Sequence, residues 1–156
     1  MEWYNKIVSD PSDLTPVLGA IEHFEREYSE ACAEMKALNG RRLQEVSTRL
    51  PGIVGYRYAQ QTELDDILGV LEIREMALMG QKRRHYLEHY NRALSDRMVE
   101  RFAEAEPDVV AMKELRNRVA AIRNKYVALS RHHEYLHFQL NNITKLRCHG
   151  VEDAIL

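Results

Sequence analysis

Hydrophobic positions in the C-terminal third of the chain follow a heptad spacing that is typical of a long α-helix. From residue 112 to residue 143, apolar side chains recur at alternating intervals of three and four, and only His133 interrupts the series. Pro107 suits the first turn of such a helix, because a residue there needs no hydrogen-bonding N–H. The pattern therefore predicts one helix over residues 107–147, about 60 Å long at 1.5 Å per residue.

A helix of that length exceeds the diameter of a small domain, which is about 30 Å, so part of its apolar seam must pack on something extended. We expect other copies of the chain to supply part of that surface, which predicts an elongated, all-α helical bundle that forms homo-oligomers. The residues assigned to the contact between copies are Leu115, Val119, Ile122, Tyr126, Leu129, Leu136, Leu140 and Ile143. The alternative is an antiparallel pairing of the first and last helices within one chain.

A second helical pattern occupies the N-terminal region, after a short lead-in over residues 1–12. Thr15 is a suitable N-cap, Pro16 suits the first helical position, and Gly40 suits the C-terminal end. Apolar residues between them are spaced by threes and fours, and glutamates occupy the other faces. The sequence therefore predicts an acidic amphipathic helix within residues 1–40.

The middle of the chain is expected to contain a break and then a further helix. The segment RLPGIVGYRY (49–58) holds one proline and two glycines, which predict an interruption. A helix is expected to resume near Tyr58, where Gly69 and Gly80 would mark bends or close helix contacts. A short helix over about residues 96–105, capped by Ser95, follows, so residues 56–156 are predicted to form the basic helical part of a single domain.

Composition excludes several classes of protein. The 156 residues include only 7 glycines and 4 prolines, which argues against turn-rich sandwiches and barrels. No stretch approaches the roughly 18 apolar residues of a membrane span, and the first residues do not have the pattern of a signal peptide. Two cysteines form no disulfide framework and fit a reducing compartment. We therefore expect a cytoplasmic protein with no membrane partner.

The net charge of −2 conceals an unequal distribution of charge along the chain. Residues 1–78 carry 8 Lys/Arg and 14 Asp/Glu, whereas residues 79–156 carry 14 and 10. Within residues 109–149 the counts are 8 basic and 2 acidic. This asymmetry indicates either a polyanionic or acidic partner or an acidic half that packs against the basic half of the same or a neighbouring subunit.

The segment QKRRHYLEHYNRALSDR (81–97) combines basic and aromatic residues in the way that a single-strand binder requires. Cations neutralise phosphates, and exposed rings stack on bases with little dependence on sequence. Tyrosines at this spacing are also common in the core of amphipathic helices. The candidate DNA-binding residues of the segment are Lys82, Arg83, Arg84, Tyr86, Tyr90, Arg92 and Arg97.

The residues His85 to His89 match the H-x-x-E-H pattern of inverted zinc peptidases, in which two histidines hold zinc and the glutamate activates water. The pattern stands alone, because no third ligand and no strand for a peptide substrate can be identified. P-loop, G-x-G-x-x-G and G-x-S-x-G motifs do not occur in the sequence either. We therefore expect a protein that is not an enzyme and that uses no cofactor or metal.

The run KRRHYLEHYNRALSDRMVERFAEAE (82–106), followed by a basic helix ending in HFQLNNITKLRCHG (137–150), resembles the phage UvsY-type recombination mediators. The resemblance covers about residues 80–150, and it implies a location in the host cytoplasm if the protein is encoded by a phage. It implies a ring-like homo-oligomer that binds single-stranded DNA and helps a RecA-like recombinase replace the single-strand-binding protein. By position, the family's DNA-contacting Lys-x-Arg pair falls on Lys82 and Arg84, and the C-terminal helix would carry assembly.

The sequence thus leads to two main functional hypotheses. The first is a single-stranded-DNA-binding recombination mediator, with DNA, the recombinase, the single-strand-binding protein and further copies of itself as partners. The second is a coiled-coil scaffold or adaptor with no nucleic-acid role, in which the oppositely charged halves simply pair. A zinc peptidase is the third and least supported alternative.

Overall fold

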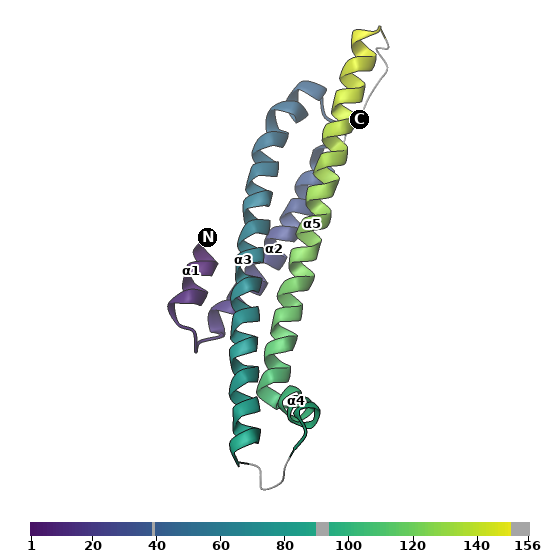
Figure 1. Ribbon diagram of the computed structural model, residues 1–156. Coiled ribbons are helices and arrows are strands. Elements are labelled where there is room, and N and C mark those ends of the chain that lie inside the picture. Colours follow the sequence, from purple (N-terminus) through teal and green to yellow (C-terminus); the bar gives the residue numbers. More distant parts are fainter. Residues whose placement is uncertain (39, 90–93, 151–156) are drawn as a thin grey trace.

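The computed structural model describes residues 1–38, 40–89 and 94–150, and those residues form helices and short connections without any strand. The helices are α1 (Glu2–Ser9), α2 (Thr15–Leu38), α3 (Leu43–His89), α4 (Asp96–Glu104) and α5 (Pro107–Cys148). The two long helices, α3 and α5, lie side by side and antiparallel, α2 packs against both, and α4 lies at one end (Figure 1). The all-α prediction is therefore confirmed, and the molecule is elongated.

The predicted boundaries of α2, α4 and α5 are close to those of the structure. Thr15 is the first helical residue and not the N-cap, because the carbonyl of Leu14 accepts the first helical hydrogen bonds, from Val17 and Leu18. The carboxylate of Asp13 accepts a further bond from the Thr15 N–H at 2.8 Å. Beyond the other end of α2, Gly40 has a φ of 74°, a conformation that glycine adopts more readily than other residues. The predicted start of α2 was thus correct to within one residue, although Thr15 does not cap it.

The predicted break at residues 49–58 is wrong, because α3 begins at Leu43 and continues through Pro51 to His89. Val46 and Leu50, on the first turns of α3, are buried against the end of α5. Burial of each such side chain contributes about 2 kcal/mol, which offsets the local cost of proline and glycine in a helix. A Cβ at Gly69 or Gly80 would meet no atom within 4 Å, so neither glycine marks the expected close helix contact.

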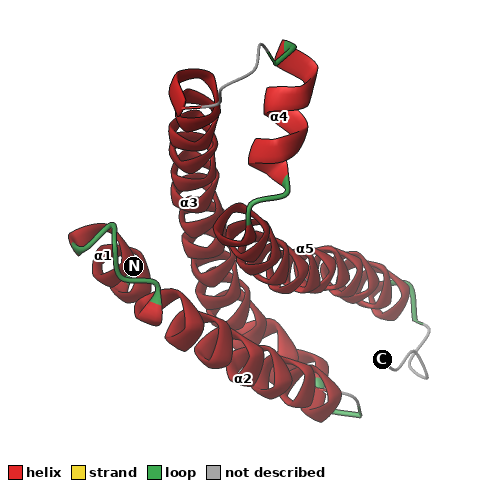
Figure 2. Cartoon of the chain, turned by 90° about the horizontal axis from the view of Figure 1, so that it is seen from below, coloured by secondary structure: helices red, strands yellow, loops and turns green. Residues whose placement is uncertain are grey.

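The predicted lead-in is a helix, α1, that α3 holds at both ends. The carboxylate of Glu63 accepts a hydrogen bond from the Trp3 N–H at 2.8 Å, at the positive end of the α1 dipole. The guanidinium of Arg74 donates to the carbonyl of Ile7 at the opposite end. The Trp3 ring lies against Gly19, where a Cβ would come within 2.8 Å of it. Figure 2 shows α1 and α5 on opposite sides of α3.

The heptad seam of α5 forms the core of the single chain. Two clusters of buried side chains run along the bundle, and α5 contributes to both of them together with α2 and α3. Of the residues assigned to the contact between copies, Ile143 is partly buried, and the following are buried within the chain: Leu115, Val119, Ile122, Tyr126, Leu129, Leu136 and Leu140. The structure corrects that assignment, because neighbouring helices of the same chain already cover the seam. The main partner of α5 is α3, not the N-terminal helix.

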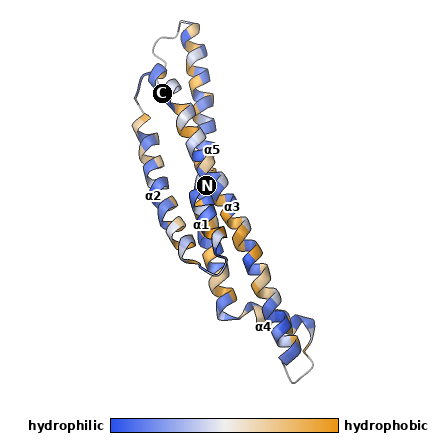
Figure 3. Ribbon diagram, turned by 90° about the vertical axis from the view of Figure 1, so that its left-hand side faces the viewer, coloured by the Kyte–Doolittle hydropathy of each residue, from blue (hydrophilic) through white to orange (hydrophobic). Residues whose placement is uncertain are grey.

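None of the helices in the described ranges has the length and apolar character needed to cross a membrane. Most residues of α4 are hydrophilic (Figure 3).

Candidate nucleic-acid interface

The described basic residues among the sequence candidates lie near the end of α3 and on α4, at the end of the bundle where α5 begins (Figure 1). Two of the candidates, Tyr90 and Arg92, lie outside the described residues. The described Lys and Arg side chains of this region, called the basic tip below, are Lys82, Arg83, Arg84, Arg97 and Arg101.

Lys82 connects the end of α3 to the start of α5. Its ammonium group lies 2.6 Å from a carboxylate oxygen of Asp108 and 3.3 Å from one of Glu106. The hydrogen bond to Asp108 is the main reason why the pKa of Lys82 is raised, and the same bond lowers the pKa of Asp108. The pKa of Glu106 is also lowered, first by its hydrogen bond from Tyr86 and then by that from Lys82. The ammonium group of Lys82 stays charged, but it is already paired with two carboxylates of the same chain. Lys82 is therefore a poor ligand for a phosphate.

Arg83 and Tyr86 also face neighbouring helices. The guanidinium of Arg83 donates to the carboxylate of Glu100 on α4, and both side chains remain about half exposed. The hydroxyl of Tyr86 donates to Glu106, and its ring lies 5.7 Å from that of Phe102. Tyr86 thus packs α4 against α3, as tyrosines on amphipathic helices commonly do.

Arg84 is exposed on a different side of α3 from Lys82. Residues two apart on an α-helix are about 200° apart around its axis, and Lys82 points toward α5. The Lys-x-Arg pair inferred from the resemblance therefore does not form one continuous face. Arg84 has no ion pair to any other residue in the described part of the chain.

Two arginines on α4 add to this exposed charge. Arg97 and Arg101 are one turn apart on the side of α4 opposite its buried residues, Val99 and Ala103. Neither has an ion pair to a described residue, and both are exposed. Arg101 was missed in the sequence, although its i, i+4 relation to Arg97 places both on one face.

The basic tip also carries carboxylates. Asp96, Glu100 and Glu104 recur at every fourth residue of α4 and therefore share one face. Glu104 forms an ion pair with Lys113 of α5 at 3.5 Å, and Glu100 accepts from Arg83. The net positive potential of the tip is consequently smaller than the count of its basic residues suggests.

The acidic and basic halves of the chain contact each other along α5. Arg116 lies 2.8 Å from Glu75, Arg123 lies 2.6 Å from Asp65, and Lys125 of α5 reaches Glu25 of α2 at 4.0 Å. These pairs join residues before position 79 to residues after it. The alternative in which the acidic half neutralises the basic half is therefore realised in part, within one chain.

A buried ionic cluster joins α2 to α3 near the middle of the bundle. The guanidinium of Arg57 is 3% exposed and lies 2.8 Å from Glu27 and 2.7 Å from Glu34. Burial lowers the pKa of Arg57, but hydrogen bonds to Glu34 and Glu27 outweigh that effect and raise the pKa overall. The cluster ties α2 to α3, because one buried guanidinium of α3 binds two carboxylates of α2.

The two histidines of the H-x-x-E-H pattern stack on each other at the end of α3, with ring centroids 4.9 Å apart. Within the described ranges, no three His, Cys, Asp or Glu side chains come close enough to hold a metal ion. The described geometry therefore gives a zinc peptidase no support.

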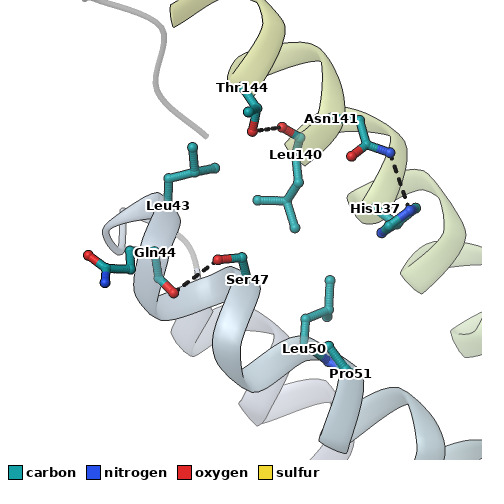
Figure 4. Close-up of a pocket in the computed structure, with 9 residues that line it drawn as sticks. All are labelled: Leu43, Gln44, Ser47, Leu50, Pro51, His137, Leu140, Asn141 and Thr144. Carbon is teal, nitrogen blue, oxygen red and sulfur yellow. Dashed lines mark hydrogen bonds between the residues drawn. The ribbon is translucent and has the colours of Figure 1, made fainter. Parts of the chain in front are cut away.

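A groove of about 430 Å³ lies at the opposite end of the bundle, between the start of α3 and the end of α5 (Figure 4). Leu43, Leu50 and Leu140 form its apolar walls, and the side chains of His137 and Asn141 are joined on its rim by a 3.2 Å hydrogen bond. No lysine or arginine lines it, so the groove offers no anchor for a phosphate.

Comparisons of the chain with protein-family models, with curated proteins and with solved structures found no match. The function must therefore be inferred from the residues and the geometry of this chain itself.

Proposed function

We propose that the chain is a non-enzymatic, single-stranded-DNA-binding recombination mediator that helps a RecA-like recombinase replace single-strand-binding protein. It acts in the cytoplasm as a homo-oligomer. The observation that carries the proposal is the exposure of Arg84 near the end of α3 and of Arg97 and Arg101 on α4, with no ion pair to a described residue. Guanidinium groups in water bind phosphates through paired hydrogen bonds, which suits them to a nucleic-acid backbone.

A single copy offers only a few cations, so strong binding requires several copies to act on one strand. Linked weak contacts reinforce one another through their high effective concentration, and each phosphate contact releases counterions. Because the heptad seam is covered within the chain, copies must meet through another surface. The mediator would then hold the strand in an open geometry while the recombinase displaces the single-strand-binding protein.

Titration of labelled oligo-dT between 50 and 300 mM salt tests the proposal directly. Three phosphate contacts per copy correspond to an affinity that falls about 40-fold over this range, since each contact on a single strand contributes about 0.7 to the logarithmic slope. The double variant Arg84→Ala/Arg97→Ala should lower that slope by about 1.4. An affinity that does not change with salt would contradict the proposal.

A matched control removes two cations near the connection between α2 and α3, away from the basic tip. Lys36 on α2 and Arg42 before α3 are both exposed, so Lys36→Ala/Arg42→Ala changes the net charge by the same amount. The control variant should bind oligo-dT as the unmodified protein does. Equal losses in both variants would show that only net charge matters and would remove the basic tip from the proposal.

The ion pairs between the two halves favour one second candidate, an adaptor whose surface charges serve only its own packing. An adaptor has no affinity for oligo-dT at physiological salt, but it still associates with itself or with a protein partner. Light-scattering mass with and without single-stranded DNA separates the two candidates.

A further inference from the structure

The last five turns of α5 and its C-cap, His149, carry a line of basic, aromatic and polar side chains on the side facing away from the bundle. Their positions alternate by four and three, which keeps them within about 40° of one direction around the helix axis. These residues, called the aromatic stripe below, are Arg131, Tyr135, Phe138, Asn142, Lys145 and His149. The buried residues of the same turns, Leu129, His133, Leu136 and Leu140, lie on the opposite side.

Both rings of the aromatic stripe are open to solvent. Tyr135 is 70% exposed and Phe138 is 64% exposed, and neither makes a ring contact with another described residue. They are three residues apart, so their attachment points differ by about 4.5 Å along the helix axis. Adjacent exposed rings with a polar rim are a feature of protein surfaces that bind a partner.

The cations around these rings indicate the charge of that partner. Arg131 precedes Tyr135 by one turn, and Lys145 follows Phe138 by two turns; both are exposed and have no ion pair to a described residue. Residues 131–149 contain three Lys/Arg and a single carboxylate, Glu134. The partner is therefore a polyanion that also presents flat apolar surfaces, which describes a single strand with unpaired bases.

A second copy of the chain fits the aromatic stripe poorly. Antiparallel pairing centred on Phe138 would place Arg131 opposite Lys145, and parallel pairing would place each cation opposite its own counterpart. Like charges directly opposite one another are unfavourable in either arrangement. A duplex fits poorly too, because its bases are stacked inside and cannot cover the rings.

We infer that the aromatic stripe is a second contact for single-stranded DNA, in which Tyr135 and Phe138 stack on bases while Arg131 and Lys145 bind phosphates. This inference rests on the proposed function and adds base stacking to the phosphate contacts of the basic tip. The two contacts lie toward opposite ends of α5 (Figure 1). One copy therefore engages two separate portions of a strand, or two strands.

The test uses the full chain and the double variant Tyr135→Ala/Phe138→Ala, with labelled oligo-dT and an abasic oligonucleotide of the same length and charge. The variant should bind oligo-dT about tenfold more weakly or worse, since each stacked base contributes enough for such a loss. Its affinity for the abasic strand should not change. The conservative variant Tyr135→Trp/Phe138→Trp should retain affinity for oligo-dT, and its added tryptophan emission should be quenched by oligo-dT but not by the abasic strand.

Two controls establish that a loss of binding arises from the stripe. Tyr58→Ala removes a tyrosine of α3 that is 62% exposed, and it should leave the affinity unchanged. Far-ultraviolet circular dichroism should show the same helix content for both alanine variants, because alanine is the strongest helix former and the lost side chains are exposed.

The remaining outcomes distinguish failure of this inference from failure of the proposed function. If the unmodified chain binds no oligo-dT at low salt, both fail. If it binds and Tyr135→Ala/Phe138→Ala binds equally well, or loses oligo-dT and abasic strand alike, stacking at the stripe is wrong while DNA binding stands. A variant that loses self-association together with DNA binding would make the stripe a contact between copies and would also overturn the inference.

Discussion

The two ends of α5 follow the same heptad pattern, yet they present very different outer surfaces. At the start of α5, Asp108 pairs with Lys82, Lys113 pairs with Glu104, and Arg116 pairs with Glu75. Near its end, Tyr135 and Phe138 are exposed, and Arg131 and Lys145 beside them have no such pairs within the described residues. Ion pairs therefore bind the start of α5 to its neighbouring helices, whereas the outer surface near its end is exposed to solvent.

The difference between the ends arises from the neighbours of α5 and not from its own pattern. At its start α5 contacts both α3 and α4, whose carboxylates satisfy its cations. At its far end the facing turns of α3 leave a groove, and no charged group of α3 lines that groove. Cations that neighbours have satisfied contribute to the fold, whereas those without neighbours remain available to a ligand.

The largest effect should come from cavities made in the two halves of the core. Ile122 is 2% exposed and is surrounded by α2 and α3, so Ile122→Ala should lower the free energy of unfolding by about 4 kcal/mol. Leu140 lines the groove, where solvent already reaches its surroundings, so Leu140→Ala should cost only about 2 kcal/mol. Urea denaturation of both variants at neutral pH measures the difference. Equal losses would show that the two ends are packed equally well.

The sequence predicts the helices whose signals are local. A capping residue and a regular apolar spacing place the ends of α2, α4 and α5 within about two residues, because those signals act over one turn. The path of α3 could not be predicted in the same way. Pro51 and its glycine neighbours favour a break locally, and only the contacts of Val46 and Leu50 with the distant α5 decide against it.

The candidate site shows the same limit. The sequence identifies the basic residues near the end of α3, but it cannot show that Lys82 faces Asp108 while Arg84 faces solvent. That distinction depends on which side of α3 is covered by α5. Tyr135 and Phe138 were missed for a related reason. They lie outside the heptad seam, and their exposure can be recognised only once it is known which side of α5 the other helices cover.

A smaller effect, a decline in the free energy of unfolding at low pH, should arise at the groove end of the core. His133 is buried near the groove end, its ring nitrogen lies 3.1 Å from the sulfur of Met35, and burial lowers its pKa. Neighbouring His132 and Arg57 lower that pKa further, and Glu34 opposes them. As the pH falls through about 6.5, His133 is therefore protonated in the unfolded chain before it is protonated in the folded chain. The contribution of neutral His133 to the free energy of unfolding is complete above that pH and declines below it.

Removal of the buried imidazole tests this pH dependence. His133→Leu should weaken the decline in the free energy of unfolding between pH 7 and pH 5, as measured by urea denaturation at several pH values. The exposed His137 provides the control, since His137→Ala should retain the decline. An unchanged decline in His133→Leu would assign the acid sensitivity to other groups.

The smallest effect on stability should come from the exposed ion pair of the basic tip. Arg83 and Glu100 are 46% and 52% exposed, and ion pairs in water contribute about 0.2–1 kcal/mol. Arg83→Ala should therefore change the free energy of unfolding by less than about 1 kcal/mol, and 0.5 M salt should abolish most of that difference. The same variant should weaken oligo-dT binding if phosphate displaces Glu100 from Arg83. The variant Glu100→Gln then discriminates: it frees Arg83 and should strengthen oligo-dT binding, whereas an unchanged affinity would mean that Arg83 serves only to hold α4 against α3.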